Sequence, residues 1–274
     1  MKFDFWPKIT FIGFLISVAF GCQNQTVSNS SNRTNTNTQT NRADQSPSQI
    51  PAPQTIKFES AGRVEIVGTF YESTKANSPA VLLLHQWGSN RKTYDEFAKR
   101  LQKQGLGVMA IDGRGFGESV RTTDGQTVGT DRGDETVKGM KADVDNAFQF
   151  LAKQKNVDAV RIGIVGASYG SSLAMIYGAE NKDVKAVALL SPGLNYFGNL
   201  PIEESVKNYG DRPLLLVAAD DDQNSAETVK KLKKSTPDPK YEMQIYRKGG
   251  HGTGLFAANI GLEDLLEKFL TKSL

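Results

Sequence analysis

Cysteine and histidine are scarce in this sequence of 274 residues, which contains one cysteine, Cys22, and two histidines, His85 and His251. A single cysteine cannot form an intramolecular disulfide. Three residues of these two types are also too few for a tetrahedral zinc site built from Cys and His ligands. We therefore expect no metal site, and a mechanism that depends on histidine must use either His85 or His251.

Neither sign of charge predominates, because 33 basic residues face 30 acidic ones for a net charge of +3. A nucleic-acid-binding protein would need a broad basic stripe interleaved with aromatic residues, and the sequence has none, so we expect no nucleic-acid partner. Four clustered lysines are expected to form a solvated helix face: Lys230, Lys231, Lys233 and Lys234. The hydrophobic fraction of 38% is ordinary for a globular domain and allows a sizeable core.

Residues 1–21 have the composition of a signal peptide. Lys2 and Lys8 give a weakly basic start, and the apolar run that follows is too short to span a bilayer comfortably as a mature helix. Cys22 directly follows the letters VAFG, which resembles a bacterial lipoprotein signal, although Ala19 stands where such signals usually carry Leu. The resemblance implies that Cys22 becomes the lipidated first residue of the mature chain. The alternatives are a plain secretory signal or an uncleaved anchor, with Cys22 an incidental thiol.

A lipid on Cys22 implies an exported protein that is anchored to a membrane of the bacterial cell envelope. Gln23, rather than Asp, follows the cysteine, and by resemblance this favours the outer membrane, on its periplasmic face or at the cell surface. Residues 22–55 are rich in Asn, Thr, Ser and Gln and lack apolar periodicity, so we expect a disordered tether. A flexible coil of this size has a reach of roughly 30 Å.

From residue 56 to residue 274 the sequence alternates strand-like and helix-like segments. One helix face is marked by the apolar positions Val137, Met140, Val144, Ala147, Phe148 and Leu151. The apolar runs that we interpret as strands lie at 64–71, 80–85, 107–112, 161–166, 184–190, 213–219 and 241–246. This alternation predicts an α/β domain with a mostly parallel sheet of about seven or eight strands and helices on both faces. The connection 191–212 is too short for a large cap domain.

Ser168 is the first candidate for a catalytic residue. It lies between Gly166 and Gly170, after a predicted strand and before a predicted helix. A G-x-S-x-G sequence in this context is a nucleophile elbow, a sharp turn that exposes the serine hydroxyl above the sheet. The turn also directs the N-terminal amides of the helix toward an oxyanion. The alternatives are an ordinary Gly-rich turn and a phosphate-binding loop, but no G-x-G-x-x-G pattern is present.

A serine nucleophile needs a base, and the base needs an orienting acid. His251 lies in a Gly-rich loop after the predicted last strand and is the candidate base. The candidate acids, 220–222, follow the strand at 213–219. Asn224 and Glu227 fit a capping box for the next helix, which leaves Asp222 in the turn before it and able to reach the histidine loop.

Asp222 is therefore our first choice for the acid, followed by Asp221 and then Asp220. The spacing of these three acids does not match a known calcium loop. The resulting chain order, Ser168, then the acid, then His251, is the order found in α/β-hydrolases.

With these motifs in place, residues 60–274 resemble an α/β-hydrolase. The letters HQWGSN at 85–90 resemble the oxyanion loop of the family, and DGRGFGES at 112–119 resembles the segment after the next strand. The resemblance implies that the backbone N–H groups of Trp87 and Tyr169 form the oxyanion hole. His85 ends a predicted strand, and we interpret it as a structural loop residue beside the active site. Gln86 is a departure, because Gly is usual at that position.

The sequence is similar to capless members that are dienelactone-hydrolase-like or peptidase-like. A cysteine nucleophile is excluded because the turn carries Ser. We expect Trp87, Tyr196 and Phe197 either to border the acyl pocket or simply to pack, and we expect three polar residues to brace the loops: Asp112, Arg114 and Ser119.

The predicted activity is that of a serine hydrolase that cleaves carboxylic esters or thioesters through an acyl-enzyme, with no cofactor. Its expected partners are a small acyl substrate and the membrane that carries the lipid anchor. Two alternatives remain open. One is a serine peptidase or amidase of the same fold, and the other is a non-catalytic, surface-anchored binding lipoprotein.

Overall fold

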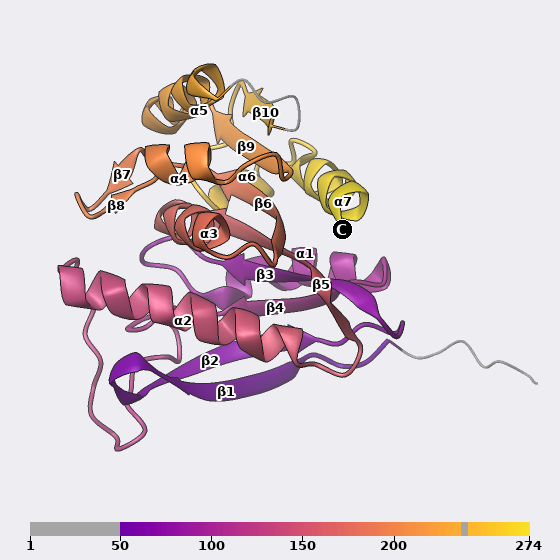
Figure 1. Ribbon diagram of the computed structural model, residues 1–274, viewed down its shortest axis with the longest axis vertical. Helices are drawn as coiled ribbons and strands as arrows, with labels where there is room; N and C mark the ends of the chain where they lie inside the picture. Colours follow the sequence, from indigo (N-terminus) through magenta and orange to yellow (C-terminus); the bar gives the residue numbers. More distant parts are fainter. Residues whose placement is uncertain (1–49, 237–240) are drawn as a thin grey trace, which may run out of the picture. The chain divides into compact units, whose positions relative to one another are not determined.

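The structure is a computed structural model that describes residues 50–236 and 241–274 (Figure 1). The predictions for the signal peptide, for Cys22 and for most of the tether therefore lie outside the described residues. The first strand, β1 (Gln54–Ser60), begins two residues before the expected start of the folded domain. No described helix has the length and apolar character needed to cross a membrane.

An eight-stranded sheet forms the centre of the domain, in the order β1-β2-β4-β3-β5-β6-β9-β10. The strand β2 pairs antiparallel with both of its neighbours, β1 and β4, and all other neighbouring strands are parallel. This confirms the predicted mostly parallel sheet, and every predicted run is a strand. The bounds are β2 Val64–Tyr71, β3 Ser78–Leu84, β4 Gly107–Ile111, β5 Val157–Ala167, β6 Val184–Leu190, β9 Leu214–Ala219 and β10 Tyr241–Tyr246.

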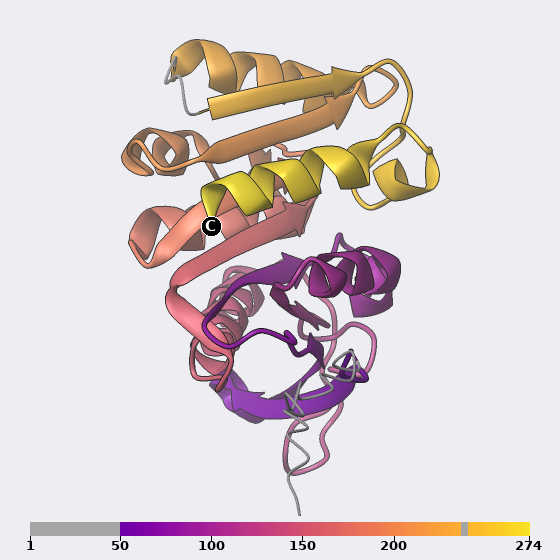
Figure 2. The same cartoon turned by 90° about the vertical axis from the view of Figure 1, so that its right-hand side faces the viewer.

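Helices cover both faces of the sheet, as predicted. Their apolar sides pack into two separate clusters of buried residues, one on each face. One face carries α2 (Asp134–Ala152), α3 (Tyr169–Glu180), α4 (Glu203–Asn208) and α5 (Gln223–Ser235). The other carries α1 (Asp95–Lys103), α6 (Gly254–Ala257) and α7 (Leu262–Ser273), and α7 faces the viewer in Figure 2.

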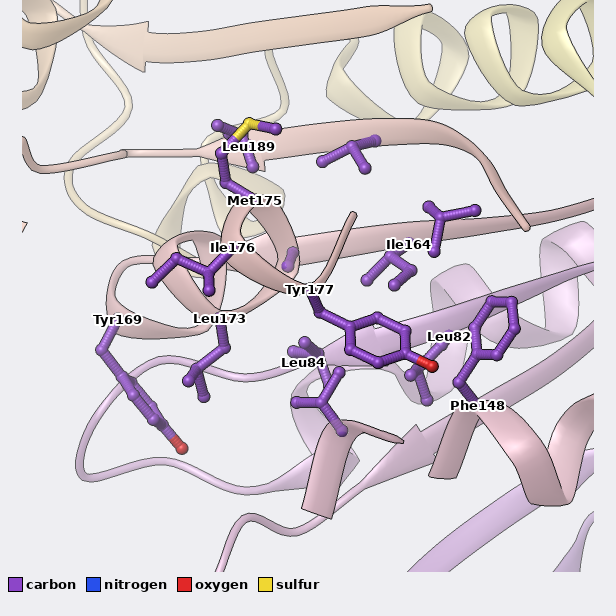
Figure 3. Packing of buried hydrophobic residues seen from close by; sticks show 14 of the residues in the cluster. Leu82, Leu84, Phe148, Ile164, Tyr169, Leu173, Met175, Ile176, Tyr177 and Leu189 are labelled. Carbon is purple, nitrogen blue, oxygen red and sulfur yellow. The ribbon is translucent and has the colours of Figure 1, made fainter. Parts of the chain in front are cut away.

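The helix α3 lies at the centre of its layer. Ten of its residues, from Tyr169 to Gly178, are buried, so it is apolar on nearly all sides, as expected for a helix enclosed by protein. Figure 3 shows Leu173 and Tyr177 of α3 beside Leu84 and Leu82 of β3. The helix α2 buries all six positions of its predicted apolar face. This packing fixes the N-terminus of α3, where Ser168 lies.

The connection between β6 and β9 contains the short strands β7 (Asn195–Tyr196) and β8 (Leu200–Pro201), followed by α4. The two strands form an antiparallel hairpin. Within the described residues this connection is the place where a cap would be inserted, and it holds only these small elements. The expected absence of a large cap domain agrees with this length.

Candidate active site

Five strand ends meet at one edge of the sheet, because the carboxyl ends of parallel strands point the same way. The 85–90 loop follows β3, Ser168 follows β5, and Ser191 follows β6. The acids 220–222 follow β9, and residues 247–253 (the histidine loop) connect β10 to α6. Residues that are up to 167 positions apart in the sequence are therefore neighbours here.

Ser168 is at the turn between β5 and α3, in a backbone conformation that side-chain-bearing residues rarely adopt (φ 53°, ψ −123°). The turn is tight because Gly170 packs directly on the end of β3. A Cβ at Gly170 would lie 2.6 Å from the carbonyl oxygen of His85 and 2.7 Å from that of Leu84. The strained φ and this close approach are the features of a nucleophile elbow.

Three predicted residues form a continuous hydrogen-bonded chain. The Oγ of Ser168 lies 2.7 Å from Nε2 of His251, and Nδ1 of His251 lies 2.7 Å from Oδ2 of Asp222. Since a carboxylate can only accept, Nδ1 carries the proton, which leaves Nε2 free to accept the hydroxyl proton of the serine. The serine side is buried, whereas the imidazole is 42% exposed. This is the arrangement of a nucleophile, a base and an orienting acid.

The carboxylate of Asp221 does not contact the imidazole. It accepts hydrogen bonds from the backbone N–H groups of Gly249 and Gly250, at 3.1 and 3.0 Å. These bonds hold the pKa of the Asp221 carboxyl below its ordinary value. Of the three adjacent acids considered from the sequence, the structure therefore brings Asp222 to the histidine, while Asp221 binds the backbone of the histidine loop. Asp220 lies 3.8 Å from the ammonium of Lys230.

The predicted capping box at Asn224 and Glu227 is wrong. The helix α5 begins at Gln223, with Asp222 at the N-cap position and with no side-chain capping bond. The carboxylate of Asp222 is bound to His251 instead. The helix therefore starts two residues earlier than the capping pattern indicated. The residue at its N-cap, Asp222, binds the imidazole of His251 and does not cap the helix with its side chain.

The start of the 85–90 loop is held in place by its first residue, His85, which is fully buried. Its Nε2 accepts a hydrogen bond from the backbone N–H of Gly113 at 2.9 Å, so Nδ1 must carry the proton that it donates to the carbonyl of Gln86 at 2.7 Å. Burial lowers the pKa of His85 and keeps the ring neutral. His85 thus has the structural position expected from the sequence.

A buried ion pair holds the other end of this loop. The guanidinium of Arg91 contacts the carboxylate of Asp112, which also accepts from the backbone N–H groups of Arg91 (2.7 Å) and Glu118 (2.8 Å). The hydroxyl of Ser119 donates to the carbonyl of Asp112. A second buried pair joins Arg114 to Asp143 through two hydrogen bonds. Asp112, Arg114 and Ser119 therefore brace the loops, in the positions predicted for them.

The predicted oxyanion donors come from two different elements. Tyr169 is the first residue of α3, where a helix leaves its N–H groups without intrahelical acceptors. The backbone N–H of Trp87 enters no hydrogen bond with the other described residues. The two side chains touch, with ring centroids 5.5 Å apart. Their role as an oxyanion hole stays a prediction.

Four aromatic rings form a continuous cluster, which we call the aromatic wall; Phe116 and Tyr169 are buried, and Trp87 and Phe197 are partly exposed. Trp87 is its centre, with edge-to-face contacts to the other rings. The members are Trp87, Phe116, Tyr169 and Phe197. The guanidinium carbon of Arg132 lies 5.1 Å from the Trp87 centroid and 4.8 Å from that of Phe197. Arg132 forms no ion pair with any described residue.

Tyr196 lies between the aromatic wall and the imidazole, with its ring centroid 6.2 Å from that of Phe197 and 6.5 Å from that of His251. Its hydroxyl donates to the carbonyl of Ser191 at 2.8 Å. Beyond Tyr196 lies an open groove of about 380 Å³. Most of its lining residues are polar, and they include Asn195, Asn224, Ser225 and Thr228 together with the charged Glu227 and Lys231. The candidate site therefore has an apolar side and a polar side.

Three residues with a place in this site escaped the sequence analysis as contributors: Ser191, Arg132 and the side chain of Gln86. Ser191 follows β6 directly, and its position at a strand end was the available signal. The side-chain contacts of Gln86 and Arg132 depend on the folded loops and have no local pattern. Among the described residues no cluster of three or more His, Cys, Asp or Glu could hold a metal ion.

Comparisons with known proteins agree with this architecture. Residues 75–208 match a family model described as serine aminopeptidase, S33. An uncharacterized protein of Mycobacterium tuberculosis is 24% identical over 242 residues, covering 82% of this chain and 81% of the relative. A carboxyl esterase of Bacillus coagulans superposes with a TM-score of 0.66 at 14% identity, over 81% of this chain and 99% of the esterase.

The dienelactone hydrolase of Anabaena variabilis gives a TM-score of 0.60 at 19% identity, again over 81% of this chain and 99% of that one. The chain has the α/β-hydrolase fold, as the sequence predicted.

Proposed function

We propose that this protein is a serine esterase that cleaves carboxylic esters or thioesters through an acyl-enzyme. The observation that carries the proposal is the chain of two 2.7 Å contacts from Ser168 through His251 to Asp222. A hydroxyl in this position transfers its proton to Nε2 as it attacks a carbonyl, and the carboxylate of Asp222 stabilises the imidazolium that forms.

The remaining steps follow from the same geometry. Negative charge on the tetrahedral intermediate is bound by the backbone N–H groups of Trp87 and Tyr169. His251 then returns the proton to the leaving alcohol or thiol, and the acyl group stays on Ser168. Water, deprotonated by His251, releases the acid. No cofactor enters this cycle.

The aromatic wall supports a substrate with an apolar acyl part, because the partly exposed rings of Trp87 and Phe197, with centroids 4.7 Å apart, offer an apolar surface at the oxyanion loop. The polar groove beyond Tyr196 is suited to the other part of the substrate. The described residues contain no large cap, and we expect the site to accept short and branched esters. Activity would then be highest with small activated esters and would not depend on a lipid–water interface.

A peptidase is the second candidate, favoured by the description of the matching family model. An aminopeptidase must bind a protonated α-amino group, for which a carboxylate is the usual partner. The charged group on the aromatic wall is instead the guanidinium of Arg132. Asp131 and Asp134, on either side of Arg132 in the chain, accept hydrogen bonds from Gly133, Thr136 and Asn199. The carboxylate that a peptidase would use is that of Glu227, which lines the groove beyond Tyr196. The cation on the aromatic wall favours the esterase.

The test uses the full-length chain and a fluorophosphonate probe, beside a Ser168→Ala variant. We expect covalent labelling of the wild type, no labelling of the variant, and a loss of ester turnover of at least about 10⁴-fold. A folded wild-type protein that is neither labelled nor active would overturn the proposal and favour the non-catalytic binding protein. A matched p-nitrophenyl ester and p-nitroanilide of the same acyl group then separate the two catalytic candidates.

We further propose that the protein is exported and is anchored to the bacterial envelope through a lipid on Cys22. The support is the apolar segment before this cysteine and the polar sequence that separates it from β1. Metabolic labelling with a radioactive fatty acid tests the anchor. We expect label on the wild type and none on Cys22→Ser, whereas equal recovery of both proteins in the soluble fraction would contradict it.

A further inference from the structure

The histidine loop is held by side chains from three different strand ends rather than by bonds within itself. Four of its backbone N–H groups, two on each side of His251, donate to side-chain acceptors. Gly249 and Gly250 donate to Asp221, Gly252 donates to Ser191 Oγ at 2.8 Å, and Thr253 donates to Gln86 Oε1 at 2.7 Å. The position of the imidazole is therefore set by the elements that carry the rest of the site.

The bond from Gln86 differs from the others because of where it originates. Gln86 lies in the 85–90 loop and directly precedes Trp87, whose backbone N–H is the predicted oxyanion donor. Its Oε1 accepts from both the backbone N–H and the Oγ of Thr253, at 2.7 and 3.2 Å. A backbone N–H can only donate, so the oxygen of the carboxamide is the end that faces Thr253. This side chain joins the oxyanion loop to the histidine loop.

The histidine loop is shaped to receive this side chain. Gly252 has a positive φ of 60°, and a Cβ at this position would overlap Oε1 of Gln86. Gly252 also directs its own N–H toward the hydroxyl of Ser191, on the other side of the loop. The long side chain of Gln86 therefore occupies space that is left free because residue 252 is a glycine.

We propose that Gln86 is a positioning residue that keeps the base and the oxyanion donors in register during catalysis. This inference rests on the proposed function. His251 must reach Ser168 Oγ in one step and the leaving group in the next, so a displacement of about 1 Å between the two loops would cost on the order of 100-fold in rate. A single carboxamide limits that displacement because it is bonded to one loop and covalently part of the other.

The uncharged character of Gln86 matters as well as its length. A glutamate could accept the same two hydrogen bonds, but its negative charge would stabilise the protonated imidazole of His251. The imidazole of that variant would then become available as a base only at a higher pH than in the wild type. The carboxamide supplies the link without this penalty. The two substitutions Gln86→Met and Gln86→Glu therefore separate loss of the link from gain of charge.

The experiment compares these two variants with Gln104→Met, a control in which an exposed carboxamide away from the site is removed. For Gln86→Met we expect kcat to fall by about 10- to 100-fold and KM to change by less than about 2-fold. For Gln86→Glu we expect activity close to wild type at high pH, with the acid limb of the kcat/KM profile moved up by about 0.5–1 pH unit. Gln104→Met should behave as wild type.

A second readout does not depend on activity. The chain has two histidines, so the imidazole region of an NMR spectrum from ¹⁵N-histidine protein contains only His85 and His251. The Nδ1–H signal of His251, hydrogen-bonded to Asp222, should broaden or vanish in Gln86→Met, while that of His85 persists as an internal control. Loss of turnover without a change in this signal would contradict the positioning role.

The outcomes distinguish this inference from the proposed function. If the wild type does not react with the fluorophosphonate probe, the esterase proposal fails, and the NMR comparison still tests whether Gln86 orders the loop. If the wild type reacts and a folded Gln86→Met variant keeps both kcat and the His251 signal, the positioning role is overturned while the esterase stands. Equal loss of kcat in Met and Glu variants would also overturn it, because Glu retains the link.

Discussion

Asp221 and Asp222 are adjacent in the chain, yet their carboxylates bind different parts of the same loop. Asp222 contacts Nδ1 of His251 at 2.7 Å, and Asp221 accepts from the backbone N–H groups of Gly249 and Gly250. One acid orients the imidazole, and the other orients the chain that carries it. Two neighbouring carboxylates thus have separate tasks, one on the His251 side chain and one on the backbone of its loop.

This division predicts different effects of two isosteric substitutions. Asp222→Asn should lower kcat by about 10⁴-fold, because an amide that donates to Nδ1 stabilises the wrong imidazole tautomer. Asp221→Asn leaves the tautomer intact and should cost only about 10-fold, through a looser loop. Steady-state kinetics on one activated ester measures both. A larger loss for Asp221→Asn than for Asp222→Asn would reverse the assignment of the acid.

The hydrogen bonds to Asp221 also predict a pH dependence of stability. The N–H groups of Gly249 and Gly250 hold the pKa of its carboxyl below the ordinary value of 3.8. The charged form is therefore favoured in the folded state, and its contribution is complete above this ordinary value and is lost as the pH falls through the lower, folded-state pKa.

The thermal midpoint of Asp221→Asn should accordingly lie below that of the wild type at pH 7, and the gap should narrow as the pH falls below 3.8. Differential scanning calorimetry at a series of pH values measures it. Asp220→Asn, which alters an exposed acid outside the loop bonds, serves as the control. A gap that widens on acidification would show that the charge of Asp221 is not favoured by folding.

The sequence predicted the sheet and the core of the site well, for physical reasons. The parallel strands β3, β4, β6 and β9 are continuous, buried apolar runs and were found for that reason. The edge strand β10 (YEMQIY) is largely half-exposed, and it was found because apolar residues alternate with polar ones along it. The strand β1 was missed because it lies at the sheet edge, and its alternation of exposed and half-buried residues, as in QTIKFES, resembles a polar linker. Ser168 was found because the glycines around it are required by close backbone packing.

The capping pattern failed for a different reason. Asn224 and Glu227 have the spacing of a capping box, but the helix starts where Asp222 is drawn to His251, a contact across 29 positions of sequence. The link from Gln86 to Thr253 spans 167 positions and has no local signature at all. Local patterns therefore located the catalytic candidates, while the residues that position them became visible only in the fold.

The buried pair of Arg91 and Asp112 predicts a large stability effect. The side chain of Arg91 is 4% exposed and that of Asp112 is fully buried. Arg91→Met would leave an uncompensated buried carboxylate, and we expect a loss of about 3–5 kcal/mol of unfolding free energy. The control is Arg100→Met, because Arg100 pairs with Asp264 and Glu267 in a more exposed setting, where we expect about 1 kcal/mol or less.

Urea denaturation of both variants measures this difference. Arg91→Met should also lower activity in parallel, since the same pair fixes the end of the 85–90 loop. If both arginine variants lost equal stability, the buried pair would not brace the loop.

The aromatic wall predicts a specificity that can be measured with a series of acyl groups. Trp87→Ala keeps the backbone N–H of the oxyanion hole but removes the ring that contacts Phe116, Tyr169 and Phe197. We expect kcat/KM to fall about 10-fold more for a butyryl ester than for an acetyl ester, because the two additional CH₂ groups contribute about 0.8 kcal/mol each when they are buried against the ring. Phe150→Ala, which alters a partly buried ring that stacks on Phe58 away from the site, is the control. An equal loss for acetyl and butyryl esters would mean that Trp87 acts on the geometry of the loop and not on the acyl group, and the acyl pocket would then lie elsewhere.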